Sequence, residues 1–138
     1  MTSPAASDHP HLQLLRAYFA AIEQGVDESV LADFFDPHVR QREFPNRLLE
    51  RGAERGLAEL LEGRRKGKDV VTGERYVIEN ALLDGDRVAV ELLWSAQLKV
   101  PLGKLRAGAT LRARCGVFFR IVGGRIAQQH NYDCFEAF

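Results

Sequence analysis

Three stretches near the end of the chain decide the fold: RVAVELLWSAQLKV (residues 87–100), ATLRARCGVFFRIV (residues 109–122) and RIAQQHNYD (residues 125–133). Apolar and polar residues alternate through much of these stretches, a pattern typical of strands with one buried face. A strand rises about 3.4 Å per residue, so a run of about 13 residues spans about 44 Å. Strands of that length must bend to fit a 138-residue chain. We therefore expect an antiparallel sheet with a concave face.

Turn residues separate these stretches from one another and from an earlier strand. Asp84-Gly85-Asp86 has hairpin chemistry and joins the 87–100 strand to a strand expected at Glu74–Leu83. Gly123-Gly124 marks a tight turn before the last strand. A further short strand is expected at His38–Phe44. The second half of the chain is thus predicted to be an antiparallel meander.

Helical spacing dominates the first half of the chain. The first helix is predicted to begin near Asp8, with Pro10 in its first turn, and to stop at Gly25. A short second helix is predicted over Glu28–Phe35, and a third from about Ala53 to Lys66. Helices followed by a meander indicate an α+β fold, in which the amphipathic helices cover the concave face of the sheet.

The composition narrows the classes of partner. The chain has 19 basic and 19 acidic residues and no net charge, which argues against nucleic acid as the main partner. There is no apolar run of about 18 residues, so no membrane span is expected. Cys115 and Cys134 have no metal-ligand spacing and are interpreted as buried, reduced thiols of a cytoplasmic protein. We expect one domain over residues 9–138 after a disordered tail of residues 1–8, with no metal and no cofactor.

Five segments, in order and at the right spacing, resemble the SnoaL-like branch of the nuclear transport factor 2-like superfamily: LLRAYF (14–19), FFDP (34–37), EFP (43–45), LDGDRVAV (83–90) and the ending from Gly124 to Asp133. The resemblance covers about residues 10 to 138. It implies a cone in which three helices fold over a curved, mainly antiparallel sheet. It also implies a pocket inside the cone and a homodimer formed through the outer face of the sheet.

Members of that superfamily include polyketide cyclases, ketosteroid isomerases, epoxide hydrolases, dehydratases and binding proteins without catalysis. The resemblance places Asn131 where cyclase-like and epoxide-hydrolase-like relatives have an aspartate. It places Phe44 where isomerase-like relatives have their base, and it gives Tyr18 the position of a tyrosine that donates to an oxyanion. An asparagine orients a ligand but takes no proton, and phenylalanine does neither. The acid–base positions of the known mechanisms are therefore replaced in this chain.

The residues themselves supply other polar candidates. Alternation along the last strand puts Gln129, Asn131 and Asp133 on one face, where they would form a hydrogen-bonding strip in the pocket; Asp133 could instead pair locally beyond the strand end. Glu43 is the one carboxylate of the first strand. Buried, it would serve as a general acid or base. Flanked by arginines, it would instead be ion-paired. Trp94 is either core or a flat wall for an apolar ligand.

We therefore predict a pocket lined by Tyr18, Phe44, Trp94, Gln129 and Asn131, with Glu43 or Asp133 at its polar end. The first hypothesis is a protein that binds a small, mostly apolar molecule without clear acid–base equipment. The alternative is an isomerase, cyclase or hydrolase that uses Glu43 or Asp133 as its general acid or base. A third possibility is a subunit that binds a protein partner through an exposed apolar patch.

Overall fold

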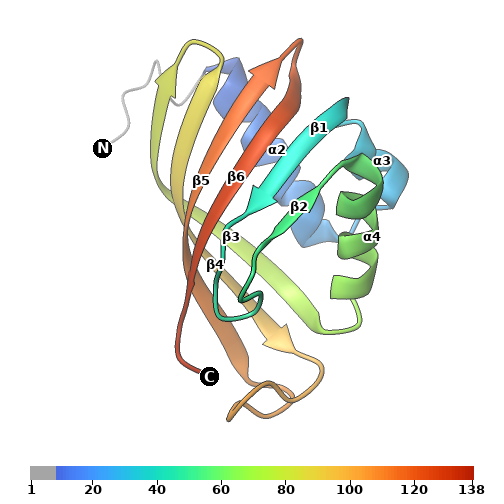
Figure 1. Ribbon diagram of the computed structural model, residues 1–138, viewed down its shortest axis with the longest axis vertical. Coiled ribbons are helices and arrows are strands. Elements are labelled where there is room, and N and C mark those ends of the chain that lie inside the picture. Colours follow the sequence, from blue (N-terminus) through green and yellow to red (C-terminus); the bar gives the residue numbers. More distant parts are fainter. Residues whose placement is uncertain (1–8) are drawn as a thin grey trace.

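The computed structural model describes residues 9–138 and shows helices packed on one face of a bent, six-stranded sheet (Figure 1). The elements follow in the order α2 (Pro10–Gln24), α3 (Glu28–Ala32), β1 (Phe35–Glu43), β2 (Ala53–Arg55), α4 (Leu57–Gly67), β3 (Val71–Asp84), β4 (Arg87–Leu98), β5 (Thr110–Val122) and β6 (Arg125–Phe135). This arrangement confirms the predicted α+β cone. The tail predicted for residues 1–8 lies outside the described residues.

The sheet has the strand order β2-β1-β6-β5-β4-β3. The meander from β3 to β6 is antiparallel throughout, as the alternation predicted. β1 pairs with β6 in parallel and with β2 in an antiparallel direction, so the sheet is mixed at one edge. The segment that contains α4 connects β2, at that edge, to β3 at the other edge of the sheet.

The core lies between the concave face of the sheet and helix α2. The helix begins after His9, whose Nδ1 accepts from the backbone N–H of His11 at 3.1 Å, and it ends at Gly25, which has φ = 66°. A positive φ suits glycine because it lacks Cβ. Leu12 and Leu15 on its inner face are fully buried. Burying one such side chain stabilises the fold by about 1.5–3 kcal/mol.

Two element boundaries differ from the sequence prediction. The second helix ends at Ala32, and Phe35 already begins β1, where it pairs with Ile126. The register of β1 against β6 then shifts before Arg40, in a stretch that includes Pro37, which has no N–H to donate. The third helix begins at Leu57, because Ala53–Arg55 forms the edge strand β2.

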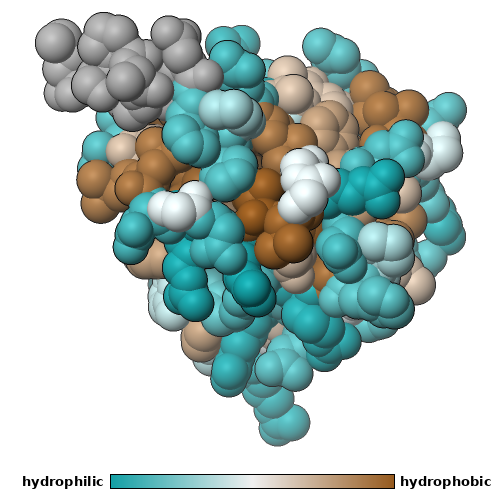
Figure 2. Space-filling view, turned by 90° about the horizontal axis from the view of Figure 1, so that it is seen from above, coloured by the Kyte–Doolittle hydropathy of each residue, from teal (hydrophilic) through white to brown (hydrophobic). Residues whose placement is uncertain are grey.

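Not all of the apolar surface is buried. Seen from one end, apolar side chains reach the surface among polar ones (Figure 2). The large exposed side chains include Leu82, 67% exposed, and Phe118, 55% exposed. Of the two cysteines, Cys115 is buried and Cys134 is exposed, and both are free, so the prediction of burial is right only for Cys115. Within residues 9–138, no helix is both long enough and apolar enough to cross a membrane.

Candidate functional site

A cavity of about 400 Å³ lies between the concave face of the sheet and the helices. Aromatic and aliphatic side chains form most of its wall, among them Tyr18, Phe19, Tyr76, Trp94 and Phe135. The rings of Phe19 and Tyr76 stack with centroids 4.7 Å apart. Leu60 and Leu61 of α4 and Leu48 and Leu49 of the loop before β2 complete the wall. Such a cavity is the usual form of a small-molecule site.

The last strand brings a strip of polar side chains to this cavity. Gln129, Asn131 and Asp133 all line it, and the alternation of β6 directs His130 and Tyr132 to the opposite face. Gln129 is 5% exposed, which makes it one of two buried polar residues in the described part of the chain. The face expected for the strip from the sequence is therefore right, and its role in binding stays a prediction.

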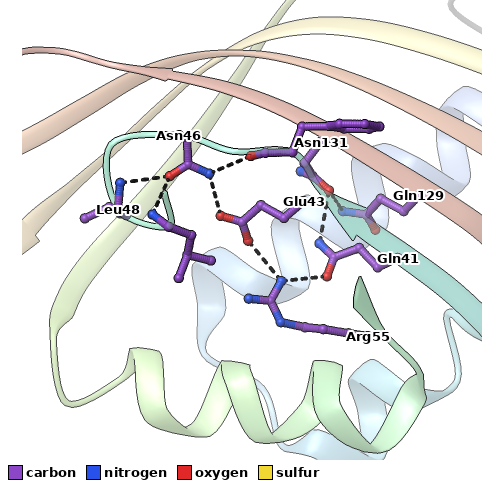
Figure 3. Close-up of polar contacts among 9 residues, drawn as sticks. Gln41, Glu43, Asn46, Leu48, Arg55, Gln129 and Asn131 are labelled. Carbon is purple, nitrogen blue, oxygen red and sulfur yellow. Dashed lines mark hydrogen bonds and ion pairs between the residues drawn. The ribbon is translucent and has the colours of Figure 1, made fainter. Parts of the chain in front are cut away.

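A chain of hydrogen bonds fixes the amides of this strip (Figure 3). Nη1 of Arg55 donates to Oε1 of Gln41 at 3.0 Å, and Nε2 of Gln41 donates to Oδ1 of Asn131 at 3.0 Å. Nε2 of Gln129 donates to the same Asn131 oxygen at 3.0 Å. Because an arginine only donates, it forces each amide in the chain into one orientation. The amide nitrogen of Asn131 is thus the donor that this side chain offers, and Asp133 is one of its partners.

Glu43 is anchored rather than free. Its Oε1 accepts from Nη1 of Arg55 at 2.9 Å, and its Oε2 accepts from Nδ2 of Asn46 at 2.9 Å (Figure 3). Oδ1 of Asn46 accepts from the backbone N–H groups of Leu48 and Leu49. Glu43 thereby ties the polar strip to the loop that carries Leu48 and Leu49 over the cavity. Both of its oxygens are engaged, so the ion-paired interpretation of Glu43 agrees with the structure.

Asp133 has a different environment. Burial raises the pKa of its carboxyl, and the negative charge of Glu43 adds to the rise, while hydrogen bonds with Cys115 and Asn131 oppose it. Its Oδ1 is buried and has no hydrogen-bond partner within residues 9–138. Burial also raises the pKa of the Cys115 thiol, which stays protonated at neutral pH and can donate. Asp133 is therefore the carboxyl of the cavity that is neither ion-paired nor fully hydrogen-bonded.

A second polar cluster comes from the other edge of the sheet. Oε2 of Glu74 on β3 accepts from Nε1 of Trp94 at 2.9 Å and from the hydroxyl of Tyr76 at 3.2 Å. Nη1 of Arg64 on α4 lies 3.3 Å from Oε1 of Glu74. Burial raises the pKa of Tyr76 well above its ordinary value, so its phenol remains a donor. Trp94 is thus both a wall of the cavity and a hydrogen-bond donor.

Tyr18 of α2 lies between the two clusters. Burial raises the pKa of its phenol, and the charge of Arg64 and a hydrogen bond with Gln129 oppose the rise. Its ring packs against Phe35 with the centroids 5.3 Å apart, edge to face. A protonated phenol here can donate to an oxygen inside the cavity.

Phe44 lies outside the cavity, so the prediction that it forms a wall is wrong. Its ring stacks on Tyr132 with centroids 4.4 Å apart, and the guanidinium of Arg42 lies over the same ring, 4.8 Å from its centroid. Both neighbours belong to the outer face of the sheet. Alternation from Glu43, which points inward, explains the error: the next residue must point outward while the chain stays extended.

Comparison with known proteins agrees with this architecture. The family model of the SnoaL-like domain matches residues 15–129. The chain belongs to the SnoaL-like domain family. No curated protein matches the sequence.

Solved structures share the fold of this SnoaL-like domain at low sequence identity. IdmH, a proposed polyketide cyclase from Streptomyces antibioticus, superposes with a TM-score of 0.75 at 15% identity over 91% of this chain and 92% of its own. A SnoaL-like polyketide cyclase from Agrobacterium tumefaciens gives a TM-score of 0.69 at 18% identity, covering 89% of this chain and 90% of its own. A protein with a ketosteroid isomerase-like fold from Catenulispora acidiphila, solved with trimethylamine, gives a TM-score of 0.68 at 17% identity over 87% and 84%. At such identities the likeness shows the fold alone.

Several side chains of the SnoaL-like site were not predicted from the sequence: Gln41, Arg55, Arg64, Glu74 and Tyr76. Gln41 and Arg55 face each other only because β2 pairs with β1, and a three-residue strand has no periodicity to detect. Arg64 looks like part of a solvated basic run at a helix end. Among residues 9–138, no group of three or more metal-ligating side chains is present.

The Arg55 network gives a prediction about stability. Arg55→Met should lower the free energy of unfolding by about 1–3 kcal/mol, because Glu43 and Gln41 lose a charged donor in a partly buried place. Adding Glu43→Gln should recover part of the loss by removing the uncompensated charge. Arg40→Met is the matched control, since Arg40 is exposed and lies 3.9 Å from Glu54 in a surface pair that contributes about 0–1 kcal/mol. Equal losses in urea unfolding for Arg55→Met and Arg40→Met would contradict the network's role.

Proposed function

We propose that this SnoaL-like domain binds a small, mostly apolar organic molecule in the cavity between the sheet and the helices. The observation that carries the proposal is a cavity of about 400 Å³ whose walls are largely apolar and whose floor holds an oriented amide strip. Apolar walls supply the affinity, and a few fixed polar groups set the orientation of the ligand. Family membership supports small-molecule binding or cyclase-type chemistry in general terms.

The test uses naphthylmethanol as a probe, because it has an apolar body and one hydroxyl. We expect it to bind the unmodified protein in a calorimetric or NMR titration. Asn131→Leu should weaken binding by about 1–3 kcal/mol, since the hydroxyl loses an oriented amide partner. Gln128→Leu changes the same strand on its outer face and should leave the affinity unchanged. Equal effects of the two substitutions, or no binding of the probe, would count against the cavity as the site.

A second candidate function is acid–base catalysis of the isomerase, cyclase or hydrolase kind. Asp133 favours it, because its carboxyl lines the cavity, has a raised pKa and forms no ion pair within residues 9–138. A carboxyl with a pKa moved toward neutrality exchanges protons more effectively near pH 7. Glu43, held by Arg55 and Asn46, is better suited to hold the strip in place.

Catalysis would be recognised by chemical conversion of a bound ketone or epoxide, followed by chromatography that separates isomers and by mass spectrometry, because an isomerisation leaves the mass unchanged. Asp133→Asn should abolish the conversion and preserve binding, because the two side chains have the same shape. Glu43→Gln should retain measurable conversion. The opposite pattern would transfer the acid–base role to Glu43.

We also propose that the outer face of the sheet pairs with a second copy of the chain. That face carries a groove of about 430 Å³ and the exposed aromatic residues Phe118 and Tyr132, whose ring centroids lie 5.8 Å apart. Exposed aromatic side chains that gather on one face of a sheet are typical of interaction sites. Light scattering should give a dimer at micromolar concentration and a monomer for Phe118→Arg. A monomer in the unmodified protein would refute the pairing.

A further inference from the structure

The charges that line the cavity do not balance. Two of the charged side chains are cations and three are carboxylates. Arg55 is paired with Glu43 at 2.9 Å, and Arg64 is paired with Glu74 at 3.3 Å. Asp133 remains, and within residues 9–138 it forms no ion pair. When it is ionised, the cavity carries one uncompensated negative charge.

The surroundings of Asp133 do not supply the missing positive charge. Cys115 lies directly across the strand pair and offers a neutral thiol. Glu43 on β1 is a second carboxylate, already held by Arg55, and Asn131 on the same strand is a neutral amide. An ionised carboxylate buried without a counterion is costly, so the site gains most from a ligand that brings a cation.

Aromatic side chains line the same cavity as this carboxyl. Phe135 follows Asp133 by two residues on β6 and lines the same cavity. Ala113 pairs with both Phe135 and Trp94, and the two rings meet edge to face with their centroids 6.0 Å apart. Ala113, between them in the sheet, has a small side chain, and all three residues line the cavity. Aromatic faces next to a carboxylate suit an ammonium group, which the ring quadrupoles also attract.

We propose that the ligand of this cavity is an organic amine, bound through its ammonium group by Asp133 and by the aromatic corner of Trp94 and Phe135. The inference rests on the proposed function, because it names the chemical class of the small molecule that the cavity takes. Organic anions are not expected as ligands of the cavity, because both cations of its wall already have carboxylate partners.

Three probes with one apolar body test the ligand class: naphthylmethylamine, naphthylmethanol and naphthoate. Calorimetric titration of the full chain should show the amine binding about tenfold or more tightly than the alcohol, because it adds a charged hydrogen bond. Naphthoate should bind more weakly than either. If the alcohol binds and the amine has no advantage, the inference is overturned and the proposed function stands. If none of the three binds, the proposed function fails as well.

The role of Asp133 is tested by Asp133→Asn, which removes the charge and keeps the shape. The tenfold preference for the amine should disappear, while the affinity for the alcohol stays the same. Glu136→Gln is the matched control, because Glu136 is an exposed carboxylate 4.0 Å from Arg112, and it should retain the preference. A preference that persists in Asp133→Asn would overturn the assignment.

The pH dependence in the unmodified protein provides a second measurement that needs no variant. Asp133 accepts the ammonium as a carboxylate, and its pKa is raised by burial. Affinity for the amine should therefore fall as the pH is lowered through that pKa, whereas affinity for the alcohol should stay constant. The Cys115 thiol remains protonated over this range because burial raises its pKa. The same pH dependence for amine and alcohol, or none for either, would contradict the pairing.

Discussion

Parallel pairing of β1 with β6 builds the polar part of the cavity. It places Gln41 beside Gln129 and Glu43 beside Asn131, so that inward side chains of both strands meet in one row. The side-chain period of a strand is two, and a slip of β1 by one residue against β6 would turn the inward side chains of β1 to the outer face. Phe44 would then take the place of Glu43 beside Asn131, which β5 holds in register. The polar floor of the cavity is therefore a consequence of register.

Two of the three carboxylates that line the cavity are compensated by arginines. The edge strand β2 adds Arg55, which compensates Glu43 and orients the amides, and α4 adds Arg64, which compensates Glu74. A buried carboxylate is tolerated where a cation and hydrogen bonds meet it. Asp133 is the exception, and the cavity around it is aromatic. This difference between paired and unpaired carboxyls is the reason that we propose a functional role for Asp133 and a structural role for Glu43.

Strong periodicity made much of this architecture predictable from the sequence. The burial of β5 alternates along its 13 residues, and alternation along β6 from Gln129 onward correctly placed Gln129, Asn131 and Asp133 on one face. The first helix could be predicted from its apolar spacing and from Gly25.

The features that the sequence did not predict are short, or they depend on residues that are far apart in the chain. Residues 53–55 have side chains that favour helices, yet they pair with the free edge of β1 and form a strand. Phe44 was placed by resemblance, although alternation from Glu43 points it outward. The partners of Arg64 and Arg55 are 10 and 12–14 residues away in the chain and are brought together by tertiary contacts alone.

We propose that the small molecule binds in the inner cavity and not in the groove of similar volume on the outer face. Intermolecular nuclear Overhauser effects between bound naphthylmethanol and the protein distinguish the two places. We expect contacts from the naphthalene protons to Leu92, Val117 and Trp94, which line the cavity. Contacts confined to Phe118, His130 and Tyr132 would place the molecule in the outer groove and refute binding in the cavity.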